Sequence, residues 1–302
     1  MYFPYLRGRQ FELIAIRELL ENNLISDKII PIIEPVRASS TLLKTIVQCK
    51  NANQPLAFII NPQVGSYLME IKGSESEKQE LEDAIKGSTI KACIVDYDIA
   101  NQVKNLSIKD TLFVVNKKDY IDLYLKTIQD EKAKFNLIPD ERDFRRKIVE
   151  PKILLSDPFD TKERNSDYSD TPEFFSDDHL YFSTDGYRGF SDYSIVGNKF
   201  SEAGFAPYCV VIHIVYFDES KRLMIRHFKS RSNEDATDPA KKFKEALESL
   251  LDWNETQKLD TYAMKQFQML YESGSYPGLG TIKKLSIMHH IELINNFFNK
   301  KA

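Results

Sequence analysis

The sequence of 302 residues has little cysteine and no long apolar run. Its three cysteines, Cys49, Cys93 and Cys209, lie far apart in or beside apolar stretches, which is typical of reduced intracellular proteins rather than disulfide scaffolds. The longest apolar stretch, residues 208–217, is far shorter than the roughly 20 residues that span a bilayer. The first ten residues have no charged-then-apolar leader. We therefore expect a cytoplasmic protein with no membrane partner.

The sequence also lacks an excess of one charge and any strong catalytic motif. Forty-one Lys and Arg residues oppose 45 Asp and Glu residues, so no global positive field indicates nucleic acid, although local basic patches stay open. With 11 Gly, 12 Pro and 42% hydrophobic residues, collagen-like and wholly disordered classes are excluded. No Walker A, GxGxxG, HExxH, GxSxG or paired CxxC motif is found. The sequence thus predicts a packed protein without assigning a reaction.

Short β-rich runs alternate with helical periodicity through most of the chain. This pattern is typical of βα units and a largely parallel sheet, so we predict an α/β, TIM-barrel-like fold, without a perfect eightfold repeat. Each early strand has an apolar body and a polar end. The predicted strands are residues 1–6, 28–35, 56–61, 91–98, 111–116, 135–139, 147–155 and 179–185.

The later chain departs from the repeat. Residues 208–217 and 223–228 follow each other so closely that they predict an inserted β-hairpin, because a parallel return needs a crossover of about a dozen residues. Residues 156–178, rich in Asp and Ser, predict an exposed acidic loop, either a lid or a linker. Residues 238–300 predict helices packed on the barrel. One barrel-like domain over residues 1–302 accounts for the whole pattern.

Polar residues end the early strands. Parallel strands present their carboxyl ends at one mouth, where Glu34 and Asp96 could divide acid and base roles or bind Mg²⁺. Alternatively, such residues only end strands and cap helices. Arg7 suits a phosphate or carboxylate, or pairs with Glu34 in a structural ion pair. The candidates at this mouth are Glu34 and Asp96 as catalytic residues, with Arg7, Asn61 and Asn116 as ligand contacts.

Residues 184–197 form a second candidate, interpreted as a loop between two strands. Glycines, aromatic residues and charges occur together there, as in binding loops on rigid scaffolds. Asp192 would act as a base or ligand, Tyr193 as an aromatic wall and Tyr187 as a stacking surface. Asp185 and Arg188 complete the set, and a structural turn is the alternative.

Histidines and a lysine near the carboxyl end form a third group. His213 and His227 lie in the two predicted hairpin strands, where neighbouring positions allow a shared hydrogen bond, although a buried structural role is the simpler interpretation. Lys283 follows a glycine-rich turn at a helix start, which makes an anion site there one interpretation and a solvated helix face the other.

Five stretches of the sequence are specific as a set: YFPYLRGRQFELIAIREL (2–19), IIPIIEPV (29–36), NPQVG (61–65), GFSDYSIVG (189–197) and GLGTIKKLSIMHHIELI (278–294). Together they resemble the bacterial and phage "beta protein" family. The resemblance spans nearly the whole chain and implies a barrel-type fold in a cytoplasmic protein. It also implies work in antiphage defence or a prophage-encoded system, beside a protein partner such as a nuclease.

Two classes of function therefore stay open. One is an enzyme acting on a small phosphorylated or nucleotide-like ligand at the strand-end mouth. The other is a non-catalytic subunit that recognises a phage component, a protein partner or a second copy of the chain. Convergence of Arg7, Glu34, Asp96 and Asp192 in one pocket favours the first class, whereas scattered positions with exposed apolar surface favour the second.

Overall fold

A computed structural model describes residues 1–87, 89–129, 131–201 and 207–300. The chain divides into two compact units: Met1–Asp157 with Asp178–Tyr193, and Pro158–Asp177 with Ser194–Ala302. The prediction of one domain over the whole chain is not tested by this division and stays a prediction. No helix in the described ranges is long and apolar enough to cross a membrane.

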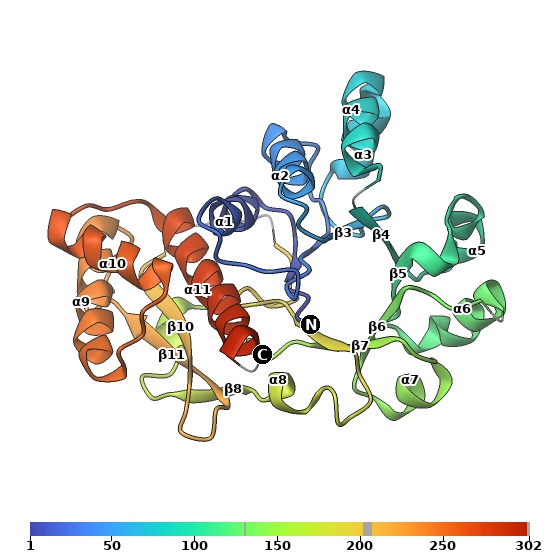
Figure 1. Cartoon of the computed structure of the whole chain (residues 1–302). Helices are drawn as coiled ribbons and strands as arrows, with labels where there is room; N and C mark the ends of the chain where they lie inside the picture. Colours follow the sequence, from blue (N-terminus) through green and yellow to red (C-terminus); the bar gives the residue numbers. More distant parts are fainter. Residues whose placement is uncertain (88, 130, 202–206, 301–302) are drawn as a thin grey trace. The chain divides into compact units, whose positions relative to one another are not determined.

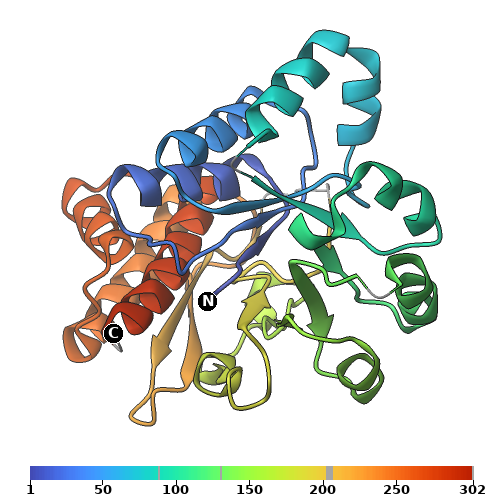
Figure 2. The ribbon, with the colours of Figure 1, turned by 45° about the vertical axis from the view of Figure 1, so that its right-hand side comes forward.

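The first unit is an eight-stranded parallel barrel surrounded by helices (Figure 1; Figure 2), which confirms the predicted fold class. The amino-terminal residues close the ring, because Tyr2 bridges Phe190 in parallel and the Phe3 N–H donates to the Phe190 carbonyl at 2.8 Å. In ring order the strands are β1 (Tyr5–Leu6), β2 (Ile32–Ile33), β3 (Leu56–Ile59), β4 (Thr89–Ile94), β5 (Thr111–Val114), β6 (Phe135–Pro139), β7 (Lys152–Ser156) and β9 (Gly189–Asp192).

The barrel interior is filled by alternate residues of the strands. Successive side chains of a strand point to opposite faces, so residues two apart share the interior. Each fully buried aliphatic side chain contributes about 1.5–3 kcal/mol. The interior cluster is Phe3, Tyr5, Ile30, Ile32, Ala57, Ile59, Ala92, Ile94, Leu112, Val114, Leu137, Ile153, Leu155 and Tyr193.

Helices connect the barrel strands. They are amphipathic crossovers, as parallel neighbours require. In chain order they are α1 (Gln10–Glu21), α2 (Ser40–Asn51), α3 (Tyr67–Gly73), α4 (Glu75–Ile85), α5 (Ile99–Gln102), α6 (Ile121–Ile128), α7 (Arg142–Lys147) and α8 (Asp178–Tyr181).

Two predictions near the end of the barrel are wrong. Residues 179–185 do not form a strand, because α8 and a turn occupy them. The last barrel strand is instead β9, within the segment interpreted as a loop. Gly189 is required there, because a Cβ at this position would lie 2.5 Å from the Met1 carbonyl oxygen.

The second unit is a three-stranded antiparallel sheet with helices. The predicted hairpin is confirmed as β10 (Val211–Phe217) and β11 (Leu223–Lys229), and β8 (Glu173–Ser176) pairs with β11. Residues 156–178 are therefore not only an exposed loop, because β8 lies within them. The helices are α9 (Pro239–Gln257), α10 (Tyr262–Ser273) and α11 (Leu279–Lys300).

Helices of the second unit pack on both faces of its sheet. On one face, Trp253 of α9 contacts the rings of Tyr216 and Phe228, with centroids 5.0 and 5.2 Å apart. On the other face, the Phe297 ring of α11 contacts the Phe217 ring of β10, with centroids 5.4 Å apart. The expected C-terminal helices thus cover the hairpin sheet, and their packing on the barrel stays a prediction.

Candidate functional site

The four polar strand ends lie at the same end of neighbouring parallel strands, as predicted. Strands β2, β3, β4 and β5 pair in parallel in that order. Glu34 directly follows β2, while Asn61, Asp96 and Asn116 each lie two residues after β3, β4 and β5. Because parallel strands share their direction, all four residues occupy the carboxyl end of the barrel.

Alternation along each strand places these side chains above the barrel interior. Ile32, Ile59, Ile94 and Val114 belong to the interior cluster, and the four polar residues follow them two positions later. Arg7 stands in the same relation to Tyr5 on β1. We call the resulting set the barrel mouth, and its members are Arg7, Glu34, Asn61, Asp96 and Asn116.

Glu34 is the centre of a buried hydrogen-bond cluster. Its carboxylate is 0% exposed and forms an ion pair with Nη1 of Arg7. The Tyr5 hydroxyl donates to Oε2 at 2.7 Å, and the Gln63 backbone N–H donates to Oε1 at 2.9 Å. Both carboxylate oxygens are thus engaged, which suits a residue that positions Arg7. The catalytic role expected for Glu34 stays a prediction.

Arg7 is held from several sides at the mouth. Its guanidinium carbon lies 5.3 Å from the ring centroids of both Tyr5 and Tyr193, within the range of cation–π attraction. Those two rings are themselves 4.8 Å apart. Gly8 follows with φ of +62°, a conformation that allows the chain to turn immediately after Arg7. The guanidinium is therefore fixed, with 14% of the side chain exposed.

The two tyrosines of this cluster stay neutral. Burial and the nearby Glu34 carboxylate raise the pKa of Tyr5 well above its usual value. Burial raises the pKa of Tyr193 to about 12. The two tyrosines of this cluster therefore act as neutral walls and donors around the Arg7–Glu34 ion pair.

Asn61 continues the sheet beyond the end of β3. Its Nδ2 donates to the Ile94 carbonyl oxygen and its Oδ1 accepts from the Ile94 N–H, both at 2.8 Å. The side-chain amide thus imitates a ladder partner for β4. This pairing holds Asn61 on the structure, and its expected ligand contact stays a prediction.

Asp96 and Asn116 form the more open side of the mouth. Asp96 is half-buried and its Oδ1 accepts from the Asp98 N–H at 2.8 Å and from Gln102 Nε2 at 3.2 Å. Asn116 is exposed. Beside them, the Tyr97 side chain is 80% exposed. The open side of the mouth thus presents an amide and a carboxylate to solvent, and the exposed Tyr97 directly follows that carboxylate in the chain.

Asp192 faces away from the mouth. It is the last residue of β9 and shares a face with Phe190, on which the Tyr2 ring stacks at 4.9 Å. The Tyr2 hydroxyl donates to Asp192 Oδ1 at 2.7 Å. Tyr193, one residue later, points to the interior. Asp192 is therefore buried on the outer face of the barrel, and its predicted catalytic role stays a prediction.

Three further candidates precede β9, at the opposite end of that strand from Asp192. Asp185 lies exposed in the turn after α8. The hydroxyl of the buried Tyr187 donates a hydrogen bond to Asp140 Oδ1 at 2.8 Å. Arg188 lies 3.9 Å from Glu150. The structure thus gives these residues local partners and does not bring them together with Arg7 and Glu34.

Lys283 belongs to α11 in the second unit. It lines a cavity of about 250 Å³ together with His213, Tyr168 and Ser286. The predicted hydrogen bond between His213 and His227 is confirmed, with the two Nδ1 atoms 2.6 Å apart.

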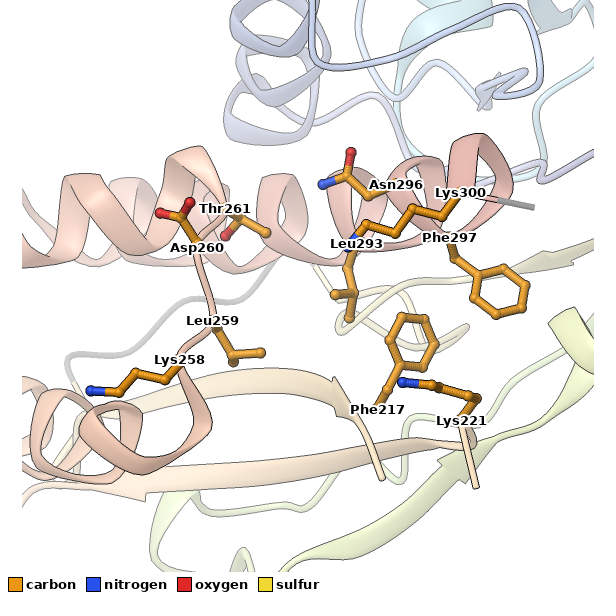
Figure 3. Close-up of a pocket in the computed structure, with 10 residues that line it drawn as sticks. All are labelled: Phe217, Lys221, Lys258, Leu259, Asp260, Thr261, Leu293, Asn296, Phe297 and Lys300. Carbon is orange, nitrogen blue, oxygen red and sulfur yellow. The ribbon is translucent and has the colours of Figure 1, made fainter. Parts of the chain in front are cut away.

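A second cavity in the same unit has a volume of about 540 Å³ (Figure 3). Phe217, Leu293 and Phe297 form its apolar part. Lys221, Lys258 and Lys300 also line it. Figure 3 shows the Lys258 ammonium pointing away from the two phenyl rings.

Tyr5 and Gln63 contact the mouth residue Glu34, and the sequence analysis missed both of them. Tyr5 could have been found, because it precedes Arg7 by two residues and therefore shares its face. Gln63 acts through its backbone, which carries no side-chain signal. Among the described residues, no group of three or more His, Cys, Asp or Glu side chains is placed to hold a metal ion. The suggested Mg²⁺ stays a prediction.

Comparison with known proteins adds no assignment to this geometry. No family model, curated protein or solved structure matches the chain.

Proposed function

We propose that the barrel mouth binds a small anionic ligand, phosphorylated or nucleotide-like, with the Arg7 guanidinium as the anion contact. The observation that carries this proposal is the fixed, partly exposed position of Arg7 beside Glu34 and two tyrosine rings. A guanidinium has five N–H donors in a planar fork, so it can contact a carboxylate and a phosphate together. Preorganisation of this kind lowers the entropy lost on binding.

The remaining mouth residues complete the proposed site. Glu34 positions Arg7, and the half-buried Asp96 is the carboxylate that a ligand would meet. The exposed Tyr97 ring offers a stacking surface for an aromatic base, a contact typically worth about 0.5–1.5 kcal/mol beyond burial. Asn116 supplies an amide for neutral polar groups.

Titration calorimetry with adenosine monophosphate tests this proposal. Arg7→Lys keeps the charge but loses the fork, so we expect its affinity to fall about tenfold or more. Arg17→Lys, on α1 and beside Glu21, is the matched control and should bind like the wild type. Equal affinity of Arg7→Lys and wild type would refute Arg7 as the anion contact.

Exposed side chains favour a second candidate function, recognition of a protein partner or a second copy of the chain. Met69 on α3 is 72% exposed, and it lies, like Tyr97, in the segments that follow β3 and β4. The family resemblance supports work in antiphage defence for either candidate. In a plaque assay, loss of protection with Arg7→Lys alone favours the ligand site, whereas loss with Met69→Asp alone favours the partner.

A further inference from the structure

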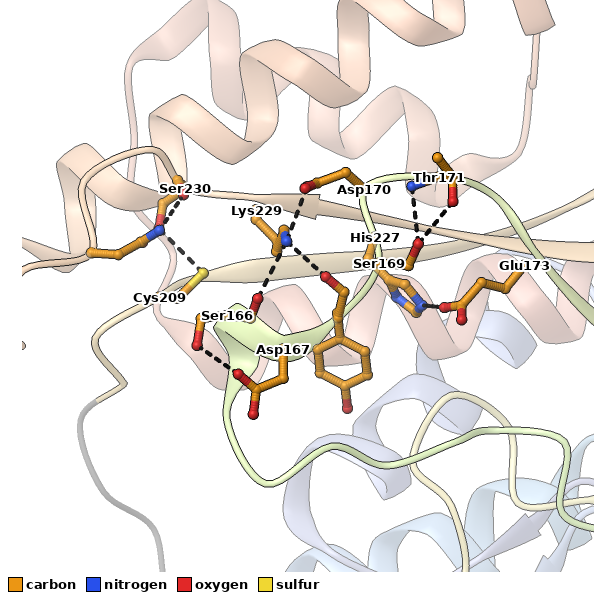
Figure 4. Close-up of polar contacts among 12 residues, drawn as sticks. Ser166, Asp167, Ser169, Asp170, Thr171, Glu173, Cys209, His227, Lys229 and Ser230 are labelled. Carbon is orange, nitrogen blue, oxygen red and sulfur yellow. Dashed lines mark hydrogen bonds and ion pairs between the residues drawn. The ribbon is translucent and has the colours of Figure 1, made fainter.

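A chain of three polar side chains crosses the sheet of the second unit. His213 and His227 are directly paired residues of β10 and β11, and their Nδ1 atoms lie 2.6 Å apart. His227 Nε2 lies 3.1 Å from Oε2 of Glu173 on β8 (Figure 4). Glu173 at one end of this row is 42% exposed, His227 in the middle is buried, and His213 at the other end is half-buried.

The chemistry of these groups fixes their protons. An ionised carboxylate only accepts, so His227 must donate from Nε2. Neutral His227 then has a bare Nδ1, which can only accept, and His213 must donate from its own Nδ1. Burial lowers the pKa of both imidazoles, and for His213 the neighbouring His227 and Lys283 lower it further, so both rings are neutral at pH 7. His213 is therefore left with an unprotonated Nε2.

His213 lines the 250 Å³ cavity, and its ring is held in place by aromatic neighbours. The Tyr168 ring centroid is 4.6 Å from both imidazoles, and Phe159 is 5.1 Å from His213. Lys229 fixes the Tyr168 backbone by donating to its carbonyl oxygen at 2.7 Å. No hydrogen-bond partner of His213 Nε2 is found in the described part of the chain.

His289 in the same unit shows what a structural histidine looks like. Its Nδ1 lies 2.7 Å from the Thr261 hydroxyl and its Nε2 lies 2.7 Å from the Val215 carbonyl oxygen. Both ring nitrogens are thereby used within the fold. His213 uses one nitrogen within the fold and has the other available at a cavity, which is the arrangement expected of a binding residue.

We propose that this cavity binds a phosphate monoester, whose P–O–H group donates a hydrogen bond to His213 Nε2 while Lys283 balances its negative charge. Thr161, Asn165 and Ser286 line the same cavity and supply further polar groups, and Phe159 and Tyr168 offer an apolar wall to the organic part. The volume suits a compact ligand, being smaller than most drug-sized sites. Glu173 and His227 act as positioning residues, because they fix which His213 nitrogen is bare.

The first test compares phenyl phosphate with benzoate by titration calorimetry of the full chain. Both probes carry a ring and a negative charge, but ionised benzoate has no O–H donor. At pH 6 about half of the phosphate ester keeps its proton, since its second pKa is about 6. We expect phenyl phosphate to bind at least about tenfold more tightly, as a charge-assisted hydrogen bond allows. Equal binding of the two probes overturns the proposal.

The pH dependence gives an independent readout. Raising the pH from 6 to 8 removes the ester proton, so we expect weaker binding of phenyl phosphate and no matching loss for benzoate. The groups that face this system are Glu173, Lys162 and Lys229 around His227, and Lys283 and Tyr168 around His213. Affinity for phenyl phosphate that does not fall between pH 6 and pH 8 contradicts the assigned proton.

Two lysine variants locate the binding. Lys283→Met should weaken phenyl phosphate binding about tenfold or more, whereas Lys284→Met, its neighbour on α11, should bind like wild type. If Arg7→Lys abolishes phenyl phosphate binding and Lys283→Met does not, the ligand occupies the barrel mouth and this proposal fails. If only Lys283→Met abolishes this binding, the ligand occupies the second-unit cavity, and this result does not depend on whether the barrel mouth binds a ligand.

Glu173→Gln tests the positioning role. A glutamine amide can donate to His227 Nε2, which permits the reversed proton order and an Nε2–H on His213. We expect the preference for phenyl phosphate over benzoate at pH 6 to shrink, with folding retained because Glu173 is partly exposed. An unchanged preference contradicts the proposal that Glu173 fixes the proton positions on His227 and His213. A merely structural Glu173 would not alter this ratio.

Discussion

Each of the two units contains a carboxylate that organises a row of hydrogen-bonded side chains. The two rows differ in the group that the carboxylate positions. In the barrel, Glu34 is fully buried, both of its oxygens are engaged, and it holds the Arg7 cation. In the second unit, Glu173 is partly exposed and ends a chain of two neutral imidazoles. The comparison teaches that the same acidic group can position either a fixed charge or an uncharged acceptor, depending on the groups it contacts.

The strongest way to break this comparison is to remove the Glu34 carboxylate. Glu34→Ala leaves the half-buried Arg7 guanidinium, the Tyr5 phenol and the Gln63 backbone N–H without their acceptor, so we expect a loss of about 3–5 kcal/mol in the free energy of unfolding. Urea denaturation followed by circular dichroism measures it. Asn116→Ala, at an exposed strand end, should change stability by less than about 0.5 kcal/mol. A loss below about 1 kcal/mol for Glu34→Ala would show that the cluster is not structural.

Mild acid should sharpen the difference between the units, because four of the five histidines lie in the second. Burial lowers the pKa of His289 to about 4 and of His290 to about 3. An unfolded histidine has a pKa near 6.5. Below this pH the unfolded chain binds more protons than the folded chain, so the free energy of unfolding decreases as the pH is lowered. Between pH 7 and pH 5 we expect each of these two histidines to lower the free energy of unfolding by about 2 kcal/mol.

Fluorescence of the single tryptophan, Trp253, reports this change, because it packs on the sheet of the second unit. Denaturation midpoints measured at pH 7, 6 and 5 should fall steadily. A midpoint that is the same at pH 5 and pH 7 would mean that these histidines are protonated as easily in the folded as in the unfolded chain.

The smallest expected effect concerns the outer face of the barrel. Tyr2→Phe removes the hydroxyl that donates to Asp192, and a hydrogen bond to a charged group is worth about 1.5–3 kcal/mol. Because Asp192 faces away from the mouth, we expect a lower melting temperature and an unchanged affinity for adenosine monophosphate. A clear loss of affinity without a change in melting temperature would return Asp192 to the binding site.

The barrel and its mouth could be predicted because the early strands are apolar runs that stop at Glu34, Asn61, Asp96 and Asn116. Strand β9 could not, since GFSD has only one large apolar residue and owes its pairing to β7 and the amino terminus, far away in sequence. Missing that strand also hid the orientation of Asp192, because a side chain's face follows from its register.

The same limit applies to β8, whose short run lies in an Asp- and Ser-rich segment. Its partner β11 begins 47 residues after the end of β8. The tautomer of His213 likewise depends on Glu173, which sequence alone does not place beside His227. The local sequence pattern predicted helices, strands and the residues at their ends. Which polar groups meet was decided by strand pairings between segments that are distant in the sequence.

The order of the segments along the chain constrains how the protein can be cut and how it emerges from the ribosome. The path leaves the barrel after Asp157, contributes β8 to the other unit, and returns at Asp178 to add the closing strand. No single cut can therefore separate the units: a fragment that stops at Asp157 lacks β9, and one that stops at Tyr193 carries β8 without β10 and β11. During synthesis, the ring can close once the chain up to Asp192 has left the ribosome. Strand β8 must wait for its partner β11, which begins more than 30 residues after Asp192.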